Sequence, residues 1–553
     1  MIVNSYKNIF GCDLRTLALV RVCLGSIVII DLLIRSLAFR AHYTDAGVLP
    51  RSALLLIDGS SGASLHMISG ASWIIGLLFL FAAMVGFLLM VGYRSRLMAF
   101  ISWILLISLD ARNGYVSQGG DMLLRMLLFW VMFLPIGARF SLDAAMGKSP
   151  DIDNQHFSLA SFGLLIQVVS VYFFTALLKD SPVWLPQGTA VYYALSIDPL
   201  VTPIGSWLLQ FPSLLTGLTY FVWVLEIMTP LLVFSPVIHL RLRLGAMALL
   251  ILMHIGFLAC LKIGIFPLVS ITSLLVLTPT AVWDWLAKRV RMRERAGIRI
   301  YYDGECLFCE KICFILRTLL ILPGTVIAPA QSRADTEAIM LEHNSWVVYD
   351  RSNNIYLRWQ AVAWLISQSP LFAVIGRMLG SRVLQRLGEK IYTTVAANRY
   401  RLSGYARTLL PYRSIDTQLS IPANLVCALL VIFIFWYNLG TLRIIDVDVP
   451  QAVQKVLGSL RLRQAWTMFA PSPSKTSGWY VAAGKLDDGR SADIFQNRIS
   501  KPTWSRESYL DLNYSTYRWR KFLSRLPLEE RVETRPYYLQ YLCRQWTLRH
   551  RDA

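Results

Sequence analysis

The stretch Tyr301-Tyr302-Asp303-Gly304-Glu305-Cys306-Leu307-Phe308-Cys309 lies between two blocks of long apolar segments. The pattern of residues 298–302 predicts a short buried strand, and a helical pattern begins at Cys306. A Cys-x-x-Cys pair at such a strand-to-helix turn is typical of thiol chemistry, because a helix N-terminus stabilises a thiolate. We therefore expect Cys306 to attack a partner disulfide and Cys309 to resolve the mixed disulfide.

Two other interpretations of these cysteines stay open. Cys306, Cys309 and Cys313 could supply three zinc ligands, but a closed zinc site needs four and no second Cys or His pair lies nearby. The pair could also be small core residues, and packing is the interpretation that we favour for Cys313. The Asp303-Gly304 turn favours the redox interpretation, and we expect no bound metal.

The rest of the chain is dominated by apolar segments. Of its 553 residues, 55% are hydrophobic, and the mean hydropathy is +0.49. A helix needs about 20 mostly apolar residues to cross a bilayer. This criterion, relaxed for two short segments, predicts nine spans, near 14–34, 71–91, 97–112, 121–137, 157–178, 214–234, 243–261, 263–282 and 422–440.

The sequence therefore predicts a mainly α protein, a polytopic helical membrane bundle with two soluble parts. A transmembrane domain covers residues 1–290, and one further membrane helix covers 422–440. Between them, strands and helices alternate over 298–412, which predicts a small α/β insert. Residues 441–553 carry short strand signals, including a hairpin around Asp488-Gly489, and predict a small β-rich cap.

The net charge of +20 does not indicate nucleic-acid binding. Arg and Lys cluster beside the apolar spans, where they act as orientation signals and contact lipid headgroups. The excess of positive charge, chiefly the run at 288–295, predicts a cytoplasmic N-terminus. The 298–412 insert would then be cytoplasmic and the C-terminus extracytoplasmic, in a bacterial inner membrane, with the lipid bilayer as the chain's main partner.

Ionisable residues inside the spans are functional candidates, because burying them in lipid is costly. Arg21 and Asp31 share the first span but lie about 15 Å apart along a helix. They need partners on other helices. Asp121 and Arg125, four residues apart, can pair on one helix face, and we favour that structural role for them.

Three further ionisable residues belong to later spans, two within a span and one at the end of a span. Glu226 and His254 are each isolated within their own segment, and a structural or a functional role is equally open for both. Lys179 ends the fifth span, where it could simply pair with Asp180. The alternative is a partly desolvated amine with a lowered pKa that acts as a general base.

The insert resembles the DCC family of predicted thiol-disulfide oxidoreductases, which have a thioredoxin-like fold. The match rests on Tyr302-Asp303-Gly304-x-Cys306-x-x-Cys309, with Trp359-Gln360-Ala361-Val362-Ala363 and Ala396-Ala397-Asn398-Arg399 in support. The resemblance covers residues 298–412. It implies redox exchange through Cys306 and Cys309, supported by Asp303, with another thiol-redox protein as partner.

The first 290 residues resemble the HTTM domain that vitamin K-dependent γ-carboxylase shares with many bacterial membrane proteins. In that carboxylase, the lysine that matches Lys179 deprotonates a reduced quinone, which implies a quinone or quinol as the cofactor here. The chain has Gly114 where the carboxylase has a functional histidine, so glutamate carboxylation is not implied. The matching residues are Arg21 with Gly25, 42–50, Arg112-Asn113, 119–121, 133–135, 141–143, Tyr172-Phe173, Lys179, His254 and 263–267.

These observations lead to one main hypothesis and two alternatives. The main hypothesis is a membrane redox protein, in which the dithiol exchanges electrons and the bundle holds a quinol or other lipophilic substrate near Lys179 and His254. The first alternative is an accessory protein for maturation or export of a secreted peptide. The second is a membrane anchor for a thiol reductase.

Overall fold

The computed structural model describes residues 7–58, 64–147, 153–290, 297–322, 324–476, 478–505 and 515–550. Four basic residues that entered the orientation argument, Lys148, Arg291, Arg293 and Arg295, lie outside these ranges.

Six described helices are long and apolar enough to cross a membrane. Two helices joined by a short break and bent by 86°, α14 (Phe266–Leu275) and α15 (Thr280–Val290), form a seventh span if they are counted as one. With the HTTM-like pattern, these helices are consistent with an integral membrane protein. The six are α2 (Leu14–Ser36), α5 (Ser72–Val91), α9 (Leu159–Leu178), α12 (Pro212–Phe234), α13 (His239–Cys260) and α22 (Ile421–Leu439).

The expected count of nine spans is not confirmed, because two of the nine fall short. The segment predicted at 97–112 forms α6 (Ser95–Arg112), whose 18 residues include three charged ones, whereas each of the six spans has an apolar stretch of 18 residues with at most two. The segment predicted at 121–137 forms α7 (Gly119–Val131), whose 13 residues extend only about 20 Å. Residues 126–131 of α7 are all buried. It is an interior helix of the bundle.

Helices α2 and α5 pack closely because glycine lies at their crossing. A Cβ atom at Gly25 would lie 2.6 Å from the carbonyl oxygen of Gly86, so no larger residue fits there without separating the helices. On its other side, α5 exposes Leu77, Leu80 and Phe87. An apolar face of this kind fits lipid rather than water.

Short elements connect the spans of the bundle. Cys12 and Asp13 (β1) pair antiparallel with Gln155–His156 (β2). The other connecting elements are α3 (Phe39–Tyr43), α4 (Arg51–Asp58), η1 (Leu65–Met67), η2 (Gly114–Val116), α8 (Leu142–Ala145), α10 (Ala190–Leu195) and α11 (Pro203–Leu208).

The insert contains a four-stranded sheet in the order β4-β3-β5-β6. Strands β3 and β4 are parallel and are joined through α16, whereas β3–β5 and β5–β6 are antiparallel. A βαβ unit followed by a hairpin and a helix is the arrangement expected for a thioredoxin-like domain. Its elements are β3 (Arg299–Tyr302), α16 (Leu307–Leu319), β4 (Val326–Pro329), η3 (Ala330–Ser332), α17 (Ala334–His343), β5 (Val347–Tyr349), β6 (Ile355–Leu357), α18 (Arg358–Ser367), α19 (Ala373–Leu379), α20 (Arg382–Ala397) and α21 (Arg399–Leu409).

The C-terminal tail has more helix than strand in its described part, so the prediction of a β-rich cap is not confirmed. The expected hairpin is present, with β7 (Ala483–Lys485) paired to β8 (Ser491–Asp493) and Gly489 in the left-handed region that the turn requires. The other elements of the tail are α23 (Gln451–Ser459), α24 (Tyr517–Arg525), η5 (Glu529–Thr534) and α25 (Arg535–Arg549). Seven of the tail's aromatic residues lie in α24 and α25.

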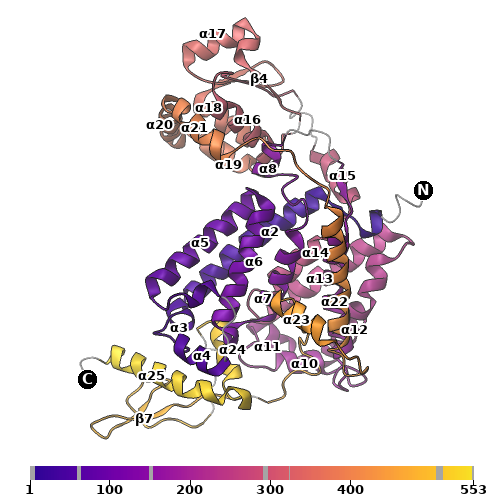
Figure 1. The fold of residues 1–553 in the computed structure, drawn as a ribbon, viewed down its shortest axis with the longest axis vertical. Coiled ribbons are helices and arrows are strands. Elements are labelled where there is room, and N and C mark those ends of the chain that lie inside the picture. The colour runs from indigo at the N-terminus through magenta and orange to yellow at the C-terminus, as the bar shows by residue number, and fades with distance from the viewer. Residues whose placement is uncertain are drawn as a thin grey trace.

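The two soluble parts lie at opposite ends of the bundle (Figure 1). The insert with α16–α21 caps one end, where α16 contacts α8. The tail, with the β7 hairpin and α25, covers the other end beside α3 and α4. Any site formed with the tail is therefore distant from the dithiol.

Candidate functional sites

The dithiol lies where the sequence predicts it, at the N-terminus of α16. Cys306 is the N-cap residue of this helix and forms a disulfide with Cys309. The backbone N–H of Cys309 donates to the Cys306 sulfur at 3.2 Å. This N–H and the helix dipole favour a negative sulfur at Cys306 once the disulfide is reduced.

Asp303 holds the turn that presents the two cysteines. Its carboxylate accepts hydrogen bonds from the Glu305 N–H at 3.1 Å and from the Gln331 amide at 3.2 Å. It also forms an ion pair with Arg399 at 3.2 Å. The two ends of the DCC-like pattern, 96 residues apart in sequence by their numbers, thus meet at this carboxylate.

Helix α21 covers the dithiol. Cys306 is fully buried, and its sulfur lies 3.8 Å from the Ser403 hydroxyl, which also accepts from the Phe308 N–H at 3.1 Å. Cys309 is half-buried. In the oxidised protein, Cys309 is therefore the more accessible of the two cysteines, because α21 covers Cys306.

Cys313 belongs to the core of the insert. It is fully buried against Ile298, Ile300 and Leu365. Burial raises the pKa of its thiol above the usual range, which makes it a poor nucleophile. The structure supports the packing interpretation for this residue.

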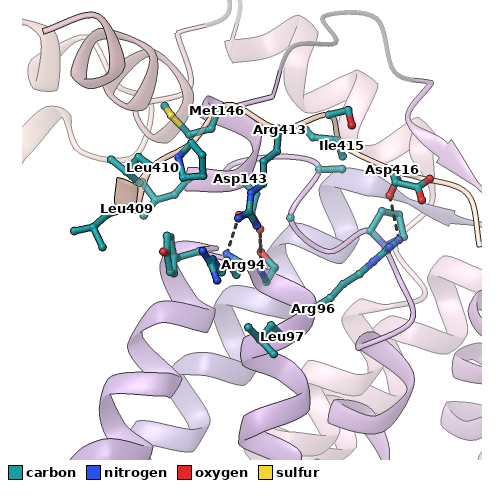
Figure 2. Close-up of a pocket in the computed structure, with 18 residues that line it drawn as sticks. Arg94, Arg96, Leu97, Asp143, Met146, Leu409, Leu410, Arg413, Ile415 and Asp416 are labelled. Atoms are coloured by element: carbon teal, nitrogen blue, oxygen red, sulfur yellow. Dashed lines mark hydrogen bonds between the residues drawn. The ribbon is translucent and has the colours of Figure 1, made fainter. Parts of the chain in front are cut away.

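The chain leaving α21 is attached to the bundle beside a cavity of about 370 Å³, shown in Figure 2. The Arg96 guanidinium donates to the Asp416 carbonyl at 3.1 Å, and the Arg413 N–H donates to the Met146 carbonyl at 3.1 Å. Asp143 accepts from two backbone N–H groups at the start of α6, both at 2.8 Å. These contacts fix the insert to the bundle end that α8 forms.

Lys179 and Glu226 form a buried ion pair at the other end of the bundle. The amine of Lys179, at the C-cap of α9, lies 2.5 Å from a carboxylate oxygen of Glu226 in α12. Only 5% of Lys179 and 3% of Glu226 are exposed. The Trp184 ring lies 4.1 Å from the amine. Lys179 therefore pairs with Glu226, not with Asp180, and Glu226, which is isolated within its own helix, has its partner on another element.

This ion pair lies at the wall of an apolar cavity of about 260 Å³. Helices α10, α12 and α13 form most of the wall, and Met468 and Phe469 of the tail close it. The indole N–H of Trp184 donates to the Phe469 carbonyl at 3.1 Å. The tail therefore completes the cavity, which fits a lipophilic molecule with one or two polar groups.

His254 does not line this cavity. Its Nε2 lies 2.9 Å from the Tyr172 hydroxyl, and the histidine is fully buried. The rings of Phe257 and Phe266 contact His254, with centroids 5.5 and 5.7 Å away, and both also line the cavity. His254 is therefore behind the cavity wall, where it can orient Tyr172.

The remaining intramembrane charges form a network that includes the tail. Asp121 accepts two hydrogen bonds of 2.8 Å from Arg518 of α24 and pairs with Arg35 at 3.0 Å. Asp31 pairs with Arg35 at 2.6 Å and also with Arg518. The expected Asp121–Arg125 pair does not form, because Arg518 and Arg35 are the ion-pair partners of Asp121.

Arg125 and Arg21 have other partners. Arg125 pairs with Asp110 of α6 at 2.8 Å. Arg21 donates to the Phe140 carbonyl at 2.6 Å and lies against Gly92, so its partners come from elements outside α2, as expected. Asp31, by contrast, finds Arg35 on its own helix as well as Arg518 elsewhere.

Sequence reasoning missed several residues of these sites. Arg35 follows Asp31 by four positions, so helical spacing could have indicated that pair. Trp184, Ser403 and Arg518 had no such signal, because each reaches its partner only through the tertiary fold. Among the described residues, no group of three or more His, Cys, Asp or Glu side chains could hold a metal ion.

Comparison with protein families agrees with this geometry. A model of the HTTM domain matches residues 11–285, and a model described as DCC1-like thiol-disulfide oxidoreductase matches residues 300–405. This chain joins an HTTM domain to a DCC1-like domain. No curated protein and no solved structure matches it.

The HTTM pattern residues mostly hold the bundle together. Arg112 donates to the Leu49 carbonyl and Asn113 to the His42 carbonyl, both at 2.9 Å. These bonds attach the end of α6 to the loop after α3. The pattern therefore marks a fold, and Lys179 is a member of it that lines the apolar cavity, together with Ile263 and Phe266.

Proposed function

We propose that this chain is an integral membrane redox protein with two sites, a thiol-disulfide exchange site and a site for a lipophilic quinol. The observation that carries the proposal is the Cys306–Cys309 disulfide at the start of α16, in a DCC1-like domain joined to an HTTM domain.

At the first site, a partner dithiol reduces the disulfide. One partner thiolate attacks Cys309 or, once α21 has moved, Cys306, and a mixed disulfide forms while the other cysteine leaves as a thiolate. The second partner thiol then releases the mixed disulfide. Two electrons and two protons pass to Cys306 and Cys309, and the partner becomes a disulfide.

At the second site, the apolar cavity holds a quinol with one hydroxyl group near Lys179. In the proposed reaction, Lys179 accepts the hydroxyl proton after passing its own proton to Glu226, its partner at 2.5 Å. The quinol then loses two electrons and two protons to dioxygen, giving quinone and hydrogen peroxide. The buried pair supports this role, because it offers one acid and one base within an apolar wall.

The two sites are proposed to act separately. The dithiol and the Lys179 cavity lie at opposite ends of the bundle (Figure 1), so no direct contact transfers electrons between them. A quinone that diffuses in the bilayer is the carrier that could connect them.

The test uses the purified full chain in lipid nanodiscs, supplied with a reduced naphthoquinone and oxygen. Mass spectrometry follows quinone formation, and a peroxidase-coupled assay follows hydrogen peroxide, for the wild type and for Lys179→Ala and Cys306→Ser. We expect Lys179→Ala to abolish product and Lys288→Ala, an exposed lysine elsewhere on the bundle, to leave it unchanged.

The same experiment separates the alternatives. No product from any variant, with Cys306 still cycling between thiol and disulfide, would refute the quinol site and leave a membrane anchor for a thiol reductase. An activity that depends on a co-encoded secreted peptide would instead favour the accessory role in peptide maturation or export.

The proposed topology places the N-terminus and the dithiol domain in the cytoplasm and the tail outside. Cys543 of the tail is exposed and free, so it can report the side. A membrane-impermeant maleimide should label Cys543 in right-side-out vesicles, and Cys543→Ser should remove that label. Labelling only in inverted vesicles would reverse the orientation.

A further inference from the structure

A second, polar cavity of about 540 Å³ lies at the tail end of the bundle. It is enclosed by α7, the tail segment 465–474 and α24. Its lining differs from that of the Lys179 cavity, because charged and hydroxyl groups dominate it. The charged residues are Asp110, Asp121, Arg125, Arg520, Lys521 and Arg525.

The two carboxylates of this cavity already have cationic partners. Asp110 pairs with Arg125 at 2.8 Å. Asp121 pairs with Arg518 and Arg35, which lie outside the cavity lining, at 2.8 and 3.0 Å. The cavity therefore has more positive charge than its own carboxylates neutralise.

Lys521 is the clearest sign of this excess. Within the described part of the chain, no carboxylate lies within ion-pair distance of its amine. Arg525 of the same helix donates to the carbonyls of Gly114 and Tyr115 at 2.8 Å, which holds it beside Lys521. Burial, together with Arg525 and Arg520, lowers the pKa of Lys521 to about 8. Adjacent cations of this kind are stabilised by an anion.

Hydroxyl groups complete the polar lining. Ser117, Thr467, Ser472 and Ser474 line the same space. Phosphate oxygens accept from guanidinium, ammonium and hydroxyl donors together, and the charge of a phosphate monoester, about −2 near neutral pH, suits several cations.

The polar cavity also adjoins the apolar one. Four residues line both spaces, so only their side chains divide a cationic pocket from a lipophilic one. A molecule with a phosphate head and an apolar body would fit the two spaces, with its head in the polar cavity and its body in the apolar one. The shared residues are Ile263, Phe266, Met468 and Phe469.

We propose that the cavity between α7, residues 465–474 and α24 binds a phosphate group, as free phosphate or as the head of a lipid phosphate monoester. The site does not depend on the proposed quinol chemistry. It would select its ligand through Lys521, Arg520 and Arg525 on one helix.

Calorimetric titration of the full chain in phosphatidylcholine nanodiscs tests the site. Sodium phosphate, dihexanoyl-phosphatidic acid, dihexanoyl-phosphatidylcholine and hexanoate are the four ligands. We expect the phosphate or the phosphatidic acid to bind, and Lys521→Gln to weaken that binding about tenfold or more. Lys521→Arg should retain binding, and Lys485→Gln, on the exposed hairpin, should leave it unchanged.

The outcomes separate the sources. Tighter binding of phosphatidic acid than of phosphate assigns the site to a lipid head group, whereas equal or weaker binding assigns it to free phosphate. Binding of hexanoate alone, of all four ligands equally, or of none would overturn the proposal. Melting temperatures show whether each variant is folded, and Arg520→Gln is a second variant expected to lose affinity if Lys521→Gln unfolds.

Discussion

The dithiol and the Lys179–Glu226 pair are assembled in opposite ways. Cys306 and Cys309 are three residues apart, and one strand-to-helix turn brings them together. Lys179 and Glu226 are 47 residues apart and meet only where α9 packs against α12. A local site of the first kind can be recognised in the sequence, whereas a site of the second kind exists only when the bundle has formed.

The surroundings of the two sites differ in the same way. Asp303 and Ser403 surround the dithiol with hydrogen bonds, whereas Lys179 and Glu226 have an apolar wall and one aromatic ring, that of Trp184. Substitutions near the dithiol should therefore alter the access of a partner thiol to the disulfide and the rate of its reduction. Changes at the membrane pair should first alter stability.

The largest expected effect is the loss of thiol exchange in Cys306→Ser. A serine cannot form the disulfide, so reduction by a partner dithiol and reoxidation should both be undetectable. Quenching the reaction by thiol alkylation, followed by mass spectrometry, measures the fractions of reduced and oxidised protein. Cys543→Ser, an exposed free cysteine, is the matched control. Full exchange activity in Cys306→Ser would remove the dithiol from the function.

Glu226→Gln should destabilise the bundle. It leaves the Lys179 ammonium buried without its partner, which typically costs about 3–5 kcal/mol. Thermal unfolding in detergent or nanodiscs measures the loss. The double variant Lys179→Met with Glu226→Gln removes the unpaired charge and should recover most of the stability. A single variant as stable as the wild type would show that the pair is not ionic.

The pH dependence of phosphate binding should report Lys521. With a pKa of about 8, its amine is charged below that pH and loses its charge above it. A phosphate monoester is already doubly charged there, since its second pKa is about 6. Affinity should therefore fall about tenfold between pH 7.5 and 9.5, and this fall should be absent in Lys521→Arg. The other titratable residues that line the cavity are Arg125, Arg520, Arg525, Asp110, Asp121 and Tyr517.

Arg399→Ala should produce the smallest effect, a faster reduction of the disulfide by a few-fold. The substitution removes the ion pair with Asp303 at the start of α21 and so loosens the helix that covers Cys306. The rate of thiol appearance with dithiothreitol measures the change. Arg401→Ala, an exposed position on the same helix, is the control. An unchanged rate in Arg399→Ala would mean that α21 does not limit access.

Much of the fold could be predicted, because periodicity and length fix a membrane helix locally. Six of the nine expected spans coincide with helices that are long and apolar enough to cross a membrane, and the hairpin at Asp488-Gly489 follows from its turn residues. Helix α7 was predicted as a span because its apolar residues resemble lipid-facing ones, although other helices bury them. The tail was predicted as β-rich because its aromatic residues suit strands, whereas seven of them lie in the helices α24 and α25.

The candidate site residues were found more readily than their partners. Lys179, Glu226 and Asp121 were indicated by their cost in an apolar environment, and all three are buried and paired. Their partners could not be read from spacing, since Arg518 is 397 residues from Asp121. The two local pairs that spacing suggested, Asp121–Arg125 and Lys179–Asp180, do not form, because Arg518 and Glu226 take those places.

The sequence alone determined the membrane bundle, the DCC1-like insert and the position of the dithiol. These depend on interactions between neighbours along the chain, such as strand and helix periodicity and the helix N-terminus at Cys306. Only the tertiary structure decided that Lys179 meets Glu226, that α21 covers Cys306 and that Lys521 lies in a cationic cavity. Each of these depends on desolvation and charge pairing between distant segments, which act only after the helices have packed.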